Sequence, residues 1–467
     1  MSKEYPVTTT LPAAVFKAYD IRGTVPDQLN PDFARGLGLA LAQRARREGV
    51  STLVVGYDGR TSSPELSAAL QEGLNAGGIH TLDLGAVPTP LVYYGAYVQE
   101  TGSGVAITGS HNPPDYNGFK MMLAGETLHG EAIQALAGIM AAPEPVTGVA
   151  PGKRTALNLV ERYIGEIKAS VHLQRPMRVA LDCGNGIGGA VAGRLFRALG
   201  CKVDELFCEV DGSFPNHHPD PADPHNLQDL IRHVQATDCE LGLAFDGDAD
   251  RLGVVTKSGQ IIWPDRQLIL YAQDILERDP GATVIYDVKC SRHVARAVKH
   301  AGGKPVMSRT GHSLIKAKLA ETGAPLAGEM SGHIFFKERW YGFDDGLYAG
   351  ARLLEILSRH DDPSAVLEAL PQDISTPEIK LGMAEGEPHA LIARLQAEGD
   401  FPSATHISTI DGVRAEYKNG FGLARASNTT PVVVLRFEGD TQEDIERIKA
   451  EFRAALLGLN PKLELPF

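Results

Sequence analysis

Long apolar stretches are missing from this chain of 467 residues. No segment approaches the roughly 18 consecutive apolar residues that a membrane-spanning helix needs. The N-terminus, from Met1 to Pro6, has neither the apolar core nor the small-residue cleavage site of a signal peptide. We therefore expect a cytoplasmic protein that has no membrane partner.

Cysteine is also scarce. No Cys-x-x-Cys pair occurs, and the five cysteines stand at irregular spacings: Cys183, Cys201, Cys208, Cys239 and Cys290. This pattern excludes a Cys-x-x-Cys zinc or redox motif and does not suggest a disulfide framework. We expect reduced thiols that are mostly buried.

Positive charge is in deficit. Lysine and arginine total 45 residues against 58 aspartates and glutamates, which gives a formal net charge of −13. This balance argues against nucleic acid or an anionic membrane as the partner, because both attract basic proteins. An anionic small-molecule ligand would need a local pocket of cationic side chains.

The sequence does contain the pattern of a large α/β protein, and its length predicts three or four domains. Up to about residue 370, short β-branched runs alternate with amphipathic helical stretches, which predicts α/β layers with largely parallel strands. Breaks in composition divide the chain into blocks at 1–150, 151–257, 258–370 and 371–467. The predicted strands include Leu53–Val55, Val179–Leu181, Leu241–Phe245, Thr283–Tyr286 and Pro325–Ala327.

Helix starts are marked by capping residues that precede proline. Asn30 stands before Pro31 and Ser63 before Pro64, so both are predicted to be N-caps. The last block has a different order of elements, typical of a small α+β domain. It is predicted to contain a helix, a strand, a loop, a strand and a helix, with the regular elements at Glu387–Glu398, His406–Thr409, Val432–Phe437 and Glu443–Leu457.

One short run presents a hydroxyl on a stiff loop. The residues Thr108-Gly109-Ser110-His111-Asn112-Pro113-Pro114 follow the apolar strand Gly104–Ile107. Glycine and proline bound the loop, so Ser110 would be held rigidly, which suits a serine that carries a phosphoryl group. The same residue types also make ordinary turns, so the interpretation depends on the rest of the chain.

A second run supplies carboxylates. Asp246, Asp248 and Asp250 alternate with small residues directly after the predicted strand Leu241–Phe245. Ligand sets made only of oxygen favour a hard cation such as Mg²⁺. An EF-hand is excluded, because Arg251 and Lys257 stand where glycine and glutamate are required. A solvated acidic turn is the alternative.

The serine loop and the acidic loop explain each other. A phosphorylated Ser110 could complete the coordination of a metal held by the aspartates, and the metal would neutralise charge on the transferred phosphoryl group. The chain contains no Walker-type phosphate loop.

Two further turns offer groups for a substrate. Glu329, Ser331 and His333 lie on a glycine-flanked turn and could bind sugar hydroxyls, although a structural loop histidine is the alternative for His333. The run from Arg425 to Thr430 offers a guanidinium, hydroxyls and an amide for a phosphate that does not react, with a plain surface turn as the alternative.

Two motifs point elsewhere. Gly184–Gly189 matches G-x-G-x-x-G after a strand, with Asp204 and Glu205 downstream, which is the pattern of a dinucleotide site. However, Asp182 at the mouth of this loop would repel a pyrophosphate, so a tight strand-to-helix turn is the preferred interpretation. The run His217-His218-Pro219-Asp220 is interpreted as a loop without catalytic function.

In this order along essentially the whole chain, the four substrate and metal motifs resemble those of the α-D-phosphohexomutase superfamily, and most closely its bacterial phosphomannomutase/phosphoglucomutase branch. The resemblance implies three similar α/β domains with mixed, largely parallel sheets, and a smaller C-terminal α+β domain, around a central cleft. It also suggests a monomer that acts on small-molecule hexose phosphates.

The resemblance implies a role for each site residue. Ser110 would be the phosphoserine and, with Asp246, Asp248 and Asp250, a ligand of Mg²⁺. The residues attending the reaction would be His111, Lys120, Arg251 and His312, with His312 or Lys120 as the general base. Glu329 and Ser331 would bind O3 and O4 of the sugar, with His333 nearby. The other substrate-binding residues would be Tyr19, Arg22, Lys289, Arg425, Ser427, Asn428 and Thr429, of which the last four form the distal phosphate site.

The implied activity is reversible phosphoryl transfer between C1 and C6 of mannose and glucose phosphates, with hexose 1,6-bisphosphate as intermediate and activator. A site that reads O3 and O4 should accept both sugars, because they differ only at C2. Phosphoglucosamine mutase is the alternative, and Met330 argues mildly against it. More remote alternatives are an NAD-dependent dehydrogenase built on Gly184–Gly189 and a sugar-phosphate sensor without turnover.

Overall fold

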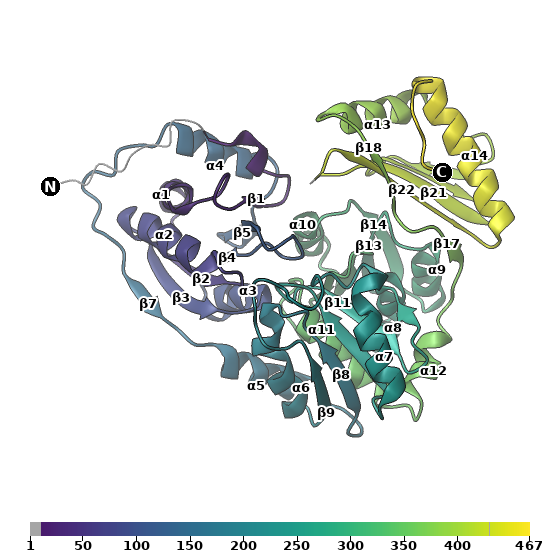
Figure 1. Ribbon diagram of the computed structural model, residues 1–467, viewed down its shortest axis with the longest axis horizontal. Helices are drawn as coiled ribbons and strands as arrows, with labels where there is room; N and C mark the ends of the chain where they lie inside the picture. Colours follow the sequence, from purple (N-terminus) through teal and green to yellow (C-terminus); the bar gives the residue numbers. More distant parts are fainter. Residues whose placement is uncertain (1–10, 429) are drawn as a thin grey trace. The chain divides into compact units, whose positions relative to one another are not determined.

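The computed structural model describes residues 11–428 and 430–467 and contains four β-sheets (Figure 1). The chain forms two compact units. The first comprises the described residues up to Gln267 together with Ser331–Ala369, and the second comprises Leu268–Met330 and Leu370–Phe467. The predicted fold class, a mixed α/β protein with four sheet-bearing domains, is confirmed. The bounds of the four predicted blocks stay a prediction.

The first unit begins with a sheet whose strand order is β1-β5-β4-β2-β3-β7, with β6 paired to β5. Strand β2 is parallel to β3 and β4, whereas β5 is antiparallel to β1 and β4. The strands are β1 (Ile21–Thr24), β2 (Thr52–Tyr57), β3 (His80–Ala86), β4 (Gly104–Ile107), β5 (Tyr116–Leu123), β6 (Glu126–Thr127) and β7 (Arg154–Ala156).

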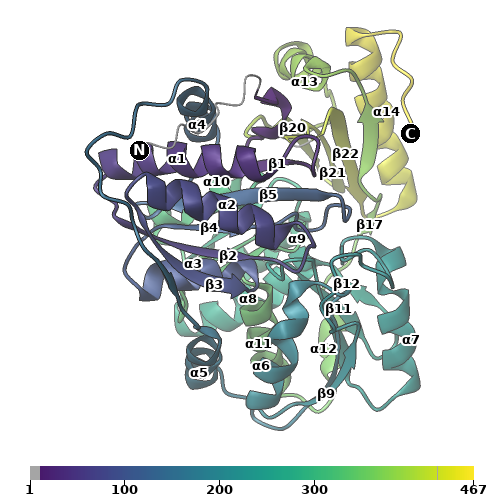
Figure 2. The same cartoon turned by 60° about the vertical axis from the view of Figure 1, so that its left-hand side comes forward.

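Helices cover both faces of this sheet, because its central strands are buried on both sides. Leu53 and Val55 of β2 belong to a core shared with α1 (Pro31–Arg47), α2 (Ser63–Ala76) and α4 (Glu131–Ala141). Val54 points the other way, towards α3 (Thr89–Val98), which lies on the opposite face from α1 and α2 (Figure 2).

The second sheet of this unit has the order β12-β11-β10-β8-β9. Strands β8, β9 and β10 are parallel, and β11 runs antiparallel to β10. The strands are β8 (Arg178–Asp182), β9 (Lys202–Leu206), β10 (Leu241–Phe245), β11 (Leu252–Thr256) and β12 (Ile261–Ile262). The remaining elements of the unit are η1 (Ala13–Val15), α5 (Val160–Ser170), η2 (Ile187–Ala190), α6 (Ala192–Ala198), η3 (Pro224–Leu227), α7 (Gln228–Ala236), β16 (Ile334–Phe336), α11 (Gly346–Leu357) and α12 (Pro363–Glu368).

In the second unit, β13 (Thr283–Asp287) lies between β14 (Lys304–Ser308) and β15 (Leu326–Gly328), and all three strands are parallel. Helices α9 (Arg292–His300) and α10 (His312–Thr322) connect these strands, and α8 (Pro264–Arg278) precedes them. The predicted strands at Thr283–Tyr286 and Pro325–Ala327 are confirmed, as are those at Leu53–Val55, Val179–Leu181 and Leu241–Phe245.

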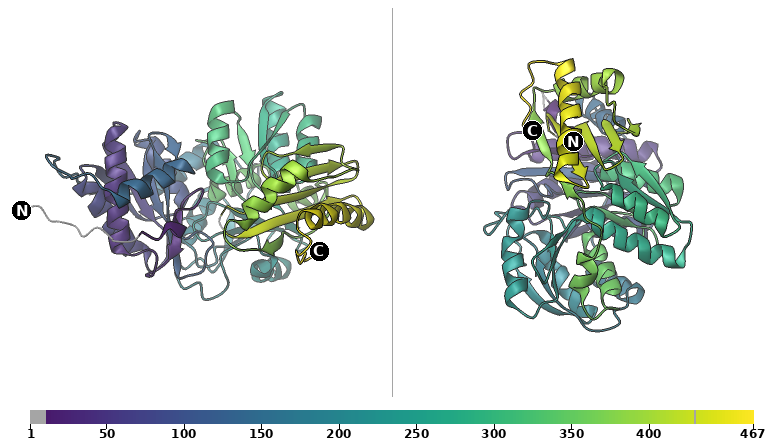
Figure 3. Two further views of the ribbon diagram at one scale, coloured as in Figure 1. Left: turned by 90° about the horizontal axis from the view of Figure 1, so that it is seen from above. Right: turned by 90° about the vertical axis from the view of Figure 1, so that its right-hand side faces the viewer.

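The second unit also contains an antiparallel sheet of order β17-β22-β21-β20-β19, with β18 paired to β22. Its strands are β17 (Ile374–Ser375), β18 (Ile379–Gly382), β19 (His406–Ser408), β20 (Val413–Tyr417), β21 (Gly420–Ala426) and β22 (Val432–Gly439). Helices α13 (Glu387–Glu398) and α14 (Gln442–Leu459) pack together on one face (Figure 3).

Two local predictions are wrong. The predicted loop between His406–Thr409 and Val432–Phe437 contains β20 and β21. Glycine in β21 weakens the local strand signal, but a Cβ on Gly422 would lie 2.3 Å from the ring of Phe452, so α14 can pack here only against glycine. Ser63 is not an N-cap either. Helix α2 begins at Ser63, whose hydroxyl donates to Asp58 at 2.6 Å. The N-cap Asn30 is confirmed, since its side chain accepts from Phe33 N.

Among the described residues, no helix combines the length and the apolar character needed to cross a membrane.

Candidate functional site

A buried arginine binds the backbone of the loop that carries Ser110. Arg60 is 1% exposed, and its guanidinium donates to the carbonyl oxygens of Ser110, Asn112 and Tyr116 at 2.8, 2.6 and 2.9 Å. Asp58 in turn binds Arg60 Nε at 3.2 Å and accepts from Gly109 N at 3.1 Å. Several backbone carbonyls thus bind one rigid guanidinium, which stabilises this conformation of the loop, with Ser110 at φ 50°.

The Ser110 hydroxyl points at the acidic loop. Its Oγ donates to Asp246 Oδ2 at 3.0 Å, across 136 residues of sequence, and lies 3.2 Å from His111 Nδ1. The two loops meet closely because Gly247 has no side chain. A Cβ there would lie 2.2 Å from the carbonyl oxygen of Ser110. The structure therefore brings together the hydroxyl and the carboxylate that the sequence associates.

The three aspartates of the acidic loop are fully buried and share two cations. Lys120 Nζ donates to Asp248 Oδ2 at 2.8 Å and to Asp250 Oδ2 at 2.6 Å. Arg251 Nε donates to Asp246 Oδ2 at 2.8 Å. These three buried carboxylates outnumber the two cations that bind them, which is unfavourable unless a further cation binds or a proton is taken up.

The pKa values reflect this excess of negative charge. Burial raises the pKa of Asp246 to about 7, with Asp250 and Asp248 adding to the shift and Arg251 opposing it. Burial also acts to raise the pKa of Asp248, but Lys120 and a hydrogen bond from Thr89 outweigh it and lower that pKa. Burial opposes ionisation of Lys120 as well, yet Asp248 and Asp250 raise its pKa well above the usual value.

These residues fit a divalent metal. Oxygen atoms of Asp246, Asp248 and Asp250 all lie within 4.8 Å of one another. Asp248 Oδ1 is buried and accepts no hydrogen bond from any described residue, so it has a lone pair available for a cation. An oxygen-only donor set of this kind is typical of sites for hard cations such as Mg²⁺.

Other predicted residues surround this cluster in the first unit. His333 Nδ1 lies 3.1 Å from Asp344 Oδ2 and 3.5 Å from Asp250 Oδ1. Ser331 offers its carbonyl oxygen to Arg251 Nη1 at 3.5 Å. Arg22 binds Asn112 of the serine loop, and Tyr19 stands shortly before β1. His111 is surrounded by cations, and burial together with Arg251, Arg22 and Lys120 lowers its pKa well below the usual value.

Sequence reasoning missed four residues that shape this cluster. Arg60 and Asp58 support the serine loop, as described above. His218 Nε2 binds the carbonyl oxygen of His111, and Asp220 lies 3.4 Å from Arg251. The segment from His217 to Asp220 therefore lies against the serine loop. Asp58-Gly59-Arg60 directly follows β2, and this polar turn after a strand is a sequence signal for a turn at the ligand-binding edge of the sheet, although it does not indicate what Arg60 binds.

In the second unit, polar groups gather where the three parallel strands end. Asp287 at the end of β13 accepts from Thr310 Oγ1 at 2.7 Å and from Met330 N at 3.1 Å. Glu329, directly after β15, accepts from Gly311 N at 2.6 Å. The turn before His312 and the turn that carries Glu329 are thus adjacent, because β14 and β15 flank β13 and all three parallel strands end at the same edge of the sheet.

Cations of the second unit form a group beside these turns. Arg425 lies on the face of β21 that carries Phe421 and Leu423, opposite the face covered by α13 and α14. Arg425 Nε binds Asp411 at 3.1 Å, and Lys289 Nζ binds Glu378 at 2.8 Å. Lys289 lowers the pKa of Glu378 to about 2, with Arg436 and Arg425 adding to the shift. These positive charges lie close enough to act on one anion.

The structure thus sorts the predicted site residues into two groups. The first unit holds Tyr19, Arg22, Ser110, His111, Lys120, Asp246, Asp248, Asp250, Arg251, Ser331 and His333. The second unit holds Lys289, His312, Glu329, Arg425, Ser427 and Asn428. Thr429 lies outside the described residues. The Gly184–Gly189 run makes a tight turn that ends in η2, and a Cβ on Gly186 would lie 2.9 Å from the backbone of Gly247.

Four family models match the chain in sequence. They are described as the alpha/beta/alpha domains I, II and III and the C-terminal domain of phosphoglucomutase/phosphomannomutase, and they cover residues 13–146, 161–259, 263–374 and 378–455.

Whole-chain relatives agree with the family models. A phosphoglucomutase of Neisseria gonorrhoeae is 57% identical over 97% of this chain and 98% of its own. A phosphomannomutase/phosphoglucomutase of Pseudomonas aeruginosa is 53% identical over 98% of each chain. A crystal structure of a phosphoglucomutase/phosphomannomutase family protein from Burkholderia thailandensis is 52% identical, covers 98% of this chain and 100% of its own, and has a TM-score of 0.94.

Proposed function

The chain belongs to the phosphoglucomutase/phosphomannomutase family, and we propose that it moves a phosphoryl group reversibly between C1 and C6 of mannose and glucose phosphates. The observation that carries this proposal is the placement of Ser110 Oγ at 3.0 Å from Asp246, within a buried set of three carboxylates. A hydroxyl in contact with a candidate metal site is what a phosphoserine enzyme requires.

In the proposed reaction, phosphorylated Ser110 gives its phosphoryl group to the free hydroxyl of a hexose phosphate. The Ser110 Oγ–P bond breaks, a bond from phosphorus to the sugar oxygen forms, and the hydroxyl proton passes to a base. The product is hexose 1,6-bisphosphate, which reorients in the site and returns its other phosphoryl group to Ser110. The O–P bond of that phosphate breaks, and the released sugar oxygen takes the proton back from the base. The same bisphosphate serves as activator, because it can phosphorylate the free serine.

Asp246, Asp248, Asp250 and Ser110 would hold Mg²⁺, which when bound supplies positive charge to the phosphoryl oxygens. Arg251 lies beside Asp246 and would add a fixed cation to the same region. Arg60 keeps the Ser110 loop in place through its carbonyls, so the nucleophile is oriented before the substrate arrives.

Two residues are candidates for the base. Lys120 Nζ donates to both Asp248 and Asp250, so a lysine that acted as base would have to lose its proton beside these carboxylates. This supports His312, which begins α10 directly after Thr310 and Gly311, the residues that bind Asp287 and Glu329. Arg425, Ser427, Asn428 and Thr429 would bind the phosphate that does not react, with Lys289 as a further substrate-binding residue. Glu329 and Ser331 would bind the sugar hydroxyls, with His333 nearby.

We also infer a monomer that works in the cytoplasm. The five cysteines are free thiols, which supports a reducing compartment. Gel filtration with light scattering would test the monomer.

Turnover of three substrates side by side tests the proposed function. Glucose 1-phosphate, mannose 1-phosphate and glucosamine 1-phosphate would each be given with Mg²⁺ and a trace of glucose 1,6-bisphosphate. We expect comparable rates on the first two, because glucose and mannose differ only at C2, and the residues assigned to O3 and O4 do not contact the C2 hydroxyl. A clear preference for the amino sugar would favour phosphoglucosamine mutase instead, and no turnover of any would refute the proposal.

Replacing Gly247 by alanine tests the close approach of the two loops. The new Cβ would lie 2.2 Å from the Ser110 carbonyl, so one loop must move. Since a displacement of about 1 Å can cost on the order of 10²-fold in rate, we expect kcat to fall by about that factor while the protein remains folded. Gly165→Ala in α5 is the matched control, because no atom lies within 4 Å of its Cβ position. Equal activity of the two variants would contradict the prediction.

Replacing Arg60 by alanine tests the support of the serine loop. The change leaves Asp58, which is 3% exposed, without its cation and frees the loop carbonyls. Breaking a buried pair typically costs about 3 kcal/mol or more, so we expect the urea midpoint to fall and activity to fall with it. Arg60→Lys should also lose activity, since one ammonium cannot bind all these carbonyls. Arg47→Ala, at a side chain that is 57% exposed, should change neither quantity.

A further inference from the structure

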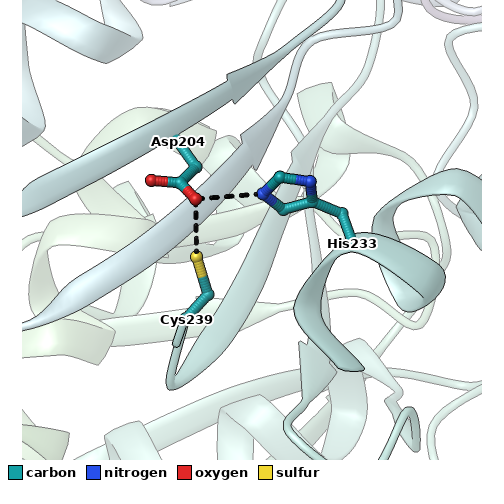
Figure 4. Close-up of side chains that lie close together, drawn as sticks. All are labelled: Asp204, His233 and Cys239. Atoms are coloured by element: carbon teal, nitrogen blue, oxygen red, sulfur yellow. Dashed lines mark hydrogen bonds and ion pairs between the residues drawn. The ribbon is translucent and has the colours of Figure 1, made fainter. Parts of the chain in front are cut away.

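A second group of possible metal ligands lies in the first unit, apart from the aspartates near Ser110. Asp204 of β9, His233 of α7 and Cys239 in the turn before β10 point their donor atoms towards one another (Figure 4). Cys239 precedes β10 whereas Asp246 follows it, so the two groups belong to opposite ends of this strand. Seven residues of extended chain correspond to roughly 20 Å.

The fold places these three side chains together. Strand β8 pairs in parallel with β9 and with β10, and it aligns Ala180 with Asp204. Leu230 and Val234 of α7 pack with Ala180 and Cys239 in one apolar cluster, to which Leu206 of β9 also belongs. Since side chains on a strand alternate between its faces, Asp204 points to the same face as Leu206. His233 precedes Val234 on α7 and reaches Asp204 at the edge of this cluster.

The distances suit one tetrahedral ion. Asp204 Oδ2 lies 3.1 Å from His233 Nε2 and 3.4 Å from Cys239 Sγ, and all three donor atoms lie within 4.8 Å of one another. Bonds of about 2.0 Å to nitrogen and oxygen and about 2.3 Å to sulfur put neighbouring ligands of a tetrahedral zinc ion with one sulfur ligand roughly 3.3–3.5 Å apart. Asp204 Oδ2 is therefore already near the spacing that such an ion needs from each of its two partners.

The surroundings also suit a cation that accepts sulfur and nitrogen. Cys239 is fully buried, whereas the side chains of Asp204 and His233 are 20% and 31% exposed, so an ion can enter from solvent and keep a water as its fourth ligand. Arg178 Nη2 lies 3.1 Å from both oxygens of Asp204 and can remain on Oδ1 while Oδ2 binds a metal. Such outer contacts commonly orient a ligating carboxylate.

We propose that Asp204 Oδ2, His233 Nε2 and Cys239 Sγ form a site for one zinc-like divalent cation, which fastens α7 to the edge of the β8–β10 sheet. A thiolate, an imidazole and a carboxylate are the donor set that zinc accepts and that Mg²⁺ does not prefer. Binding forms the metal–sulfur bond and releases the thiol proton to solvent. The metal and the thiol proton compete for the same sulfur, so the affinity should fall as the pH is lowered.

A titration of the full-length protein with Co²⁺ alone tests the site. The protein carries Asp248→Asn, so that the other candidate metal site is weakened. We expect a thiolate-to-cobalt charge-transfer band that saturates at one equivalent and is removed by Zn²⁺ but not by Mg²⁺. Cys239→Ser should abolish the band, and His233→Gln, at a half-exposed position that threatens folding less, should weaken binding by about 10-fold or more.

Cys208→Ser is the matched control, because Cys208 Sγ lies 3.4 Å from Cys183 Sγ and two neighbouring thiols could also bind cobalt. The band should survive in this variant. Loss of the band in Cys208→Ser, its survival in Cys239→Ser, or its absence from the parent protein would each overturn the proposal. Mutase activity with Mg²⁺ is expected to be unchanged by Cys239→Ser in the otherwise wild-type chain, so the outcome does not depend on the proposed function.

Discussion

Ser110→Ala protein is expected to carry no phosphoryl group and to lose turnover by at least about 10³-fold, as when the nucleophile of a covalent mechanism is removed. Ser110 is the hydroxyl that contacts Asp246, at 3.0 Å. The nearby Thr108 hydroxyl cannot replace it, because Thr108 Oγ1 donates to Asp58 at 2.8 Å and accepts from Ser110 N. Intact-protein mass spectrometry after incubation with glucose 1,6-bisphosphate would measure the phosphoryl group, and a coupled assay would measure turnover.

Folding can be separated from chemistry in this experiment. Ser110 has φ 50°, and alanine is no more strained there than serine, so the melting temperature should stay close to that of the parent protein. Ser403→Ala, at an exposed position of the second unit, is the matched control and should keep both the phosphoryl group and turnover. A folded Ser110→Ala protein that still takes up one phosphoryl group and turns over would show that the nucleophile lies elsewhere.

Asp248→Asn should lower turnover by about 10²-fold or more and raise the Mg²⁺ concentration needed for half-maximal activity. Asparagine has nearly the same shape but lacks the charge, and it replaces one carboxylate oxygen by an amide nitrogen that cannot bind a cation. The carboxylate is fully buried, with Oδ1 free of hydrogen bonds to any described residue and Oδ2 bound to Lys120 and Thr89. The measurement is the rate as a function of Mg²⁺ after the parent protein and the variant have been treated with a chelator.

Asp400→Asn provides the comparison, because Asp400 is exposed and far along the chain from the acidic loop. This control should show the metal dependence of the parent protein. Treatment with the chelator should abolish activity of the parent protein, and added Mg²⁺ should restore it. If Asp248→Asn shows the same rate and the same Mg²⁺ dependence as Asp400→Asn, the acidic loop has a structural role and binds no catalytic metal.

Much of the chemistry could be predicted from local sequence. Each candidate loop directly follows a short apolar strand, as with Ser110 after Gly104–Ile107 and Asp246 after Leu241–Phe245. Such strands are recognisable because they are buried on both faces, and polar residues at their carboxyl ends commonly bind ligands in α/β proteins. The residue types then indicate the chemistry, since three carboxylates on one loop suit a hard cation wherever the loop lies.

The residues that hold these loops and strands in place could not be predicted in the same way. Nothing around Arg60 in the sequence indicates that its guanidinium binds carbonyls at Ser110 and Tyr116, some 50 residues away along the chain. The glycines of β21 likewise weaken the local strand signal, although Gly422 is where α14 packs. Local propensity reflects neighbours in sequence, whereas these positions are set by neighbours in space.

The same distinction applies to the acidic loop and to the proposed zinc site. The types of residue present, such as a carboxylate beside a small residue or an isolated cysteine, follow from the sequence, and so does the chemistry each can perform. Which of them meet depends on strand pairing and helix packing over long separations, as when Ser110 reaches Asp246 across 136 residues. Those contacts also set the protonation states, because the burial that raises the pKa of Asp246 to about 7 exists only once the sheets and helices have packed around it.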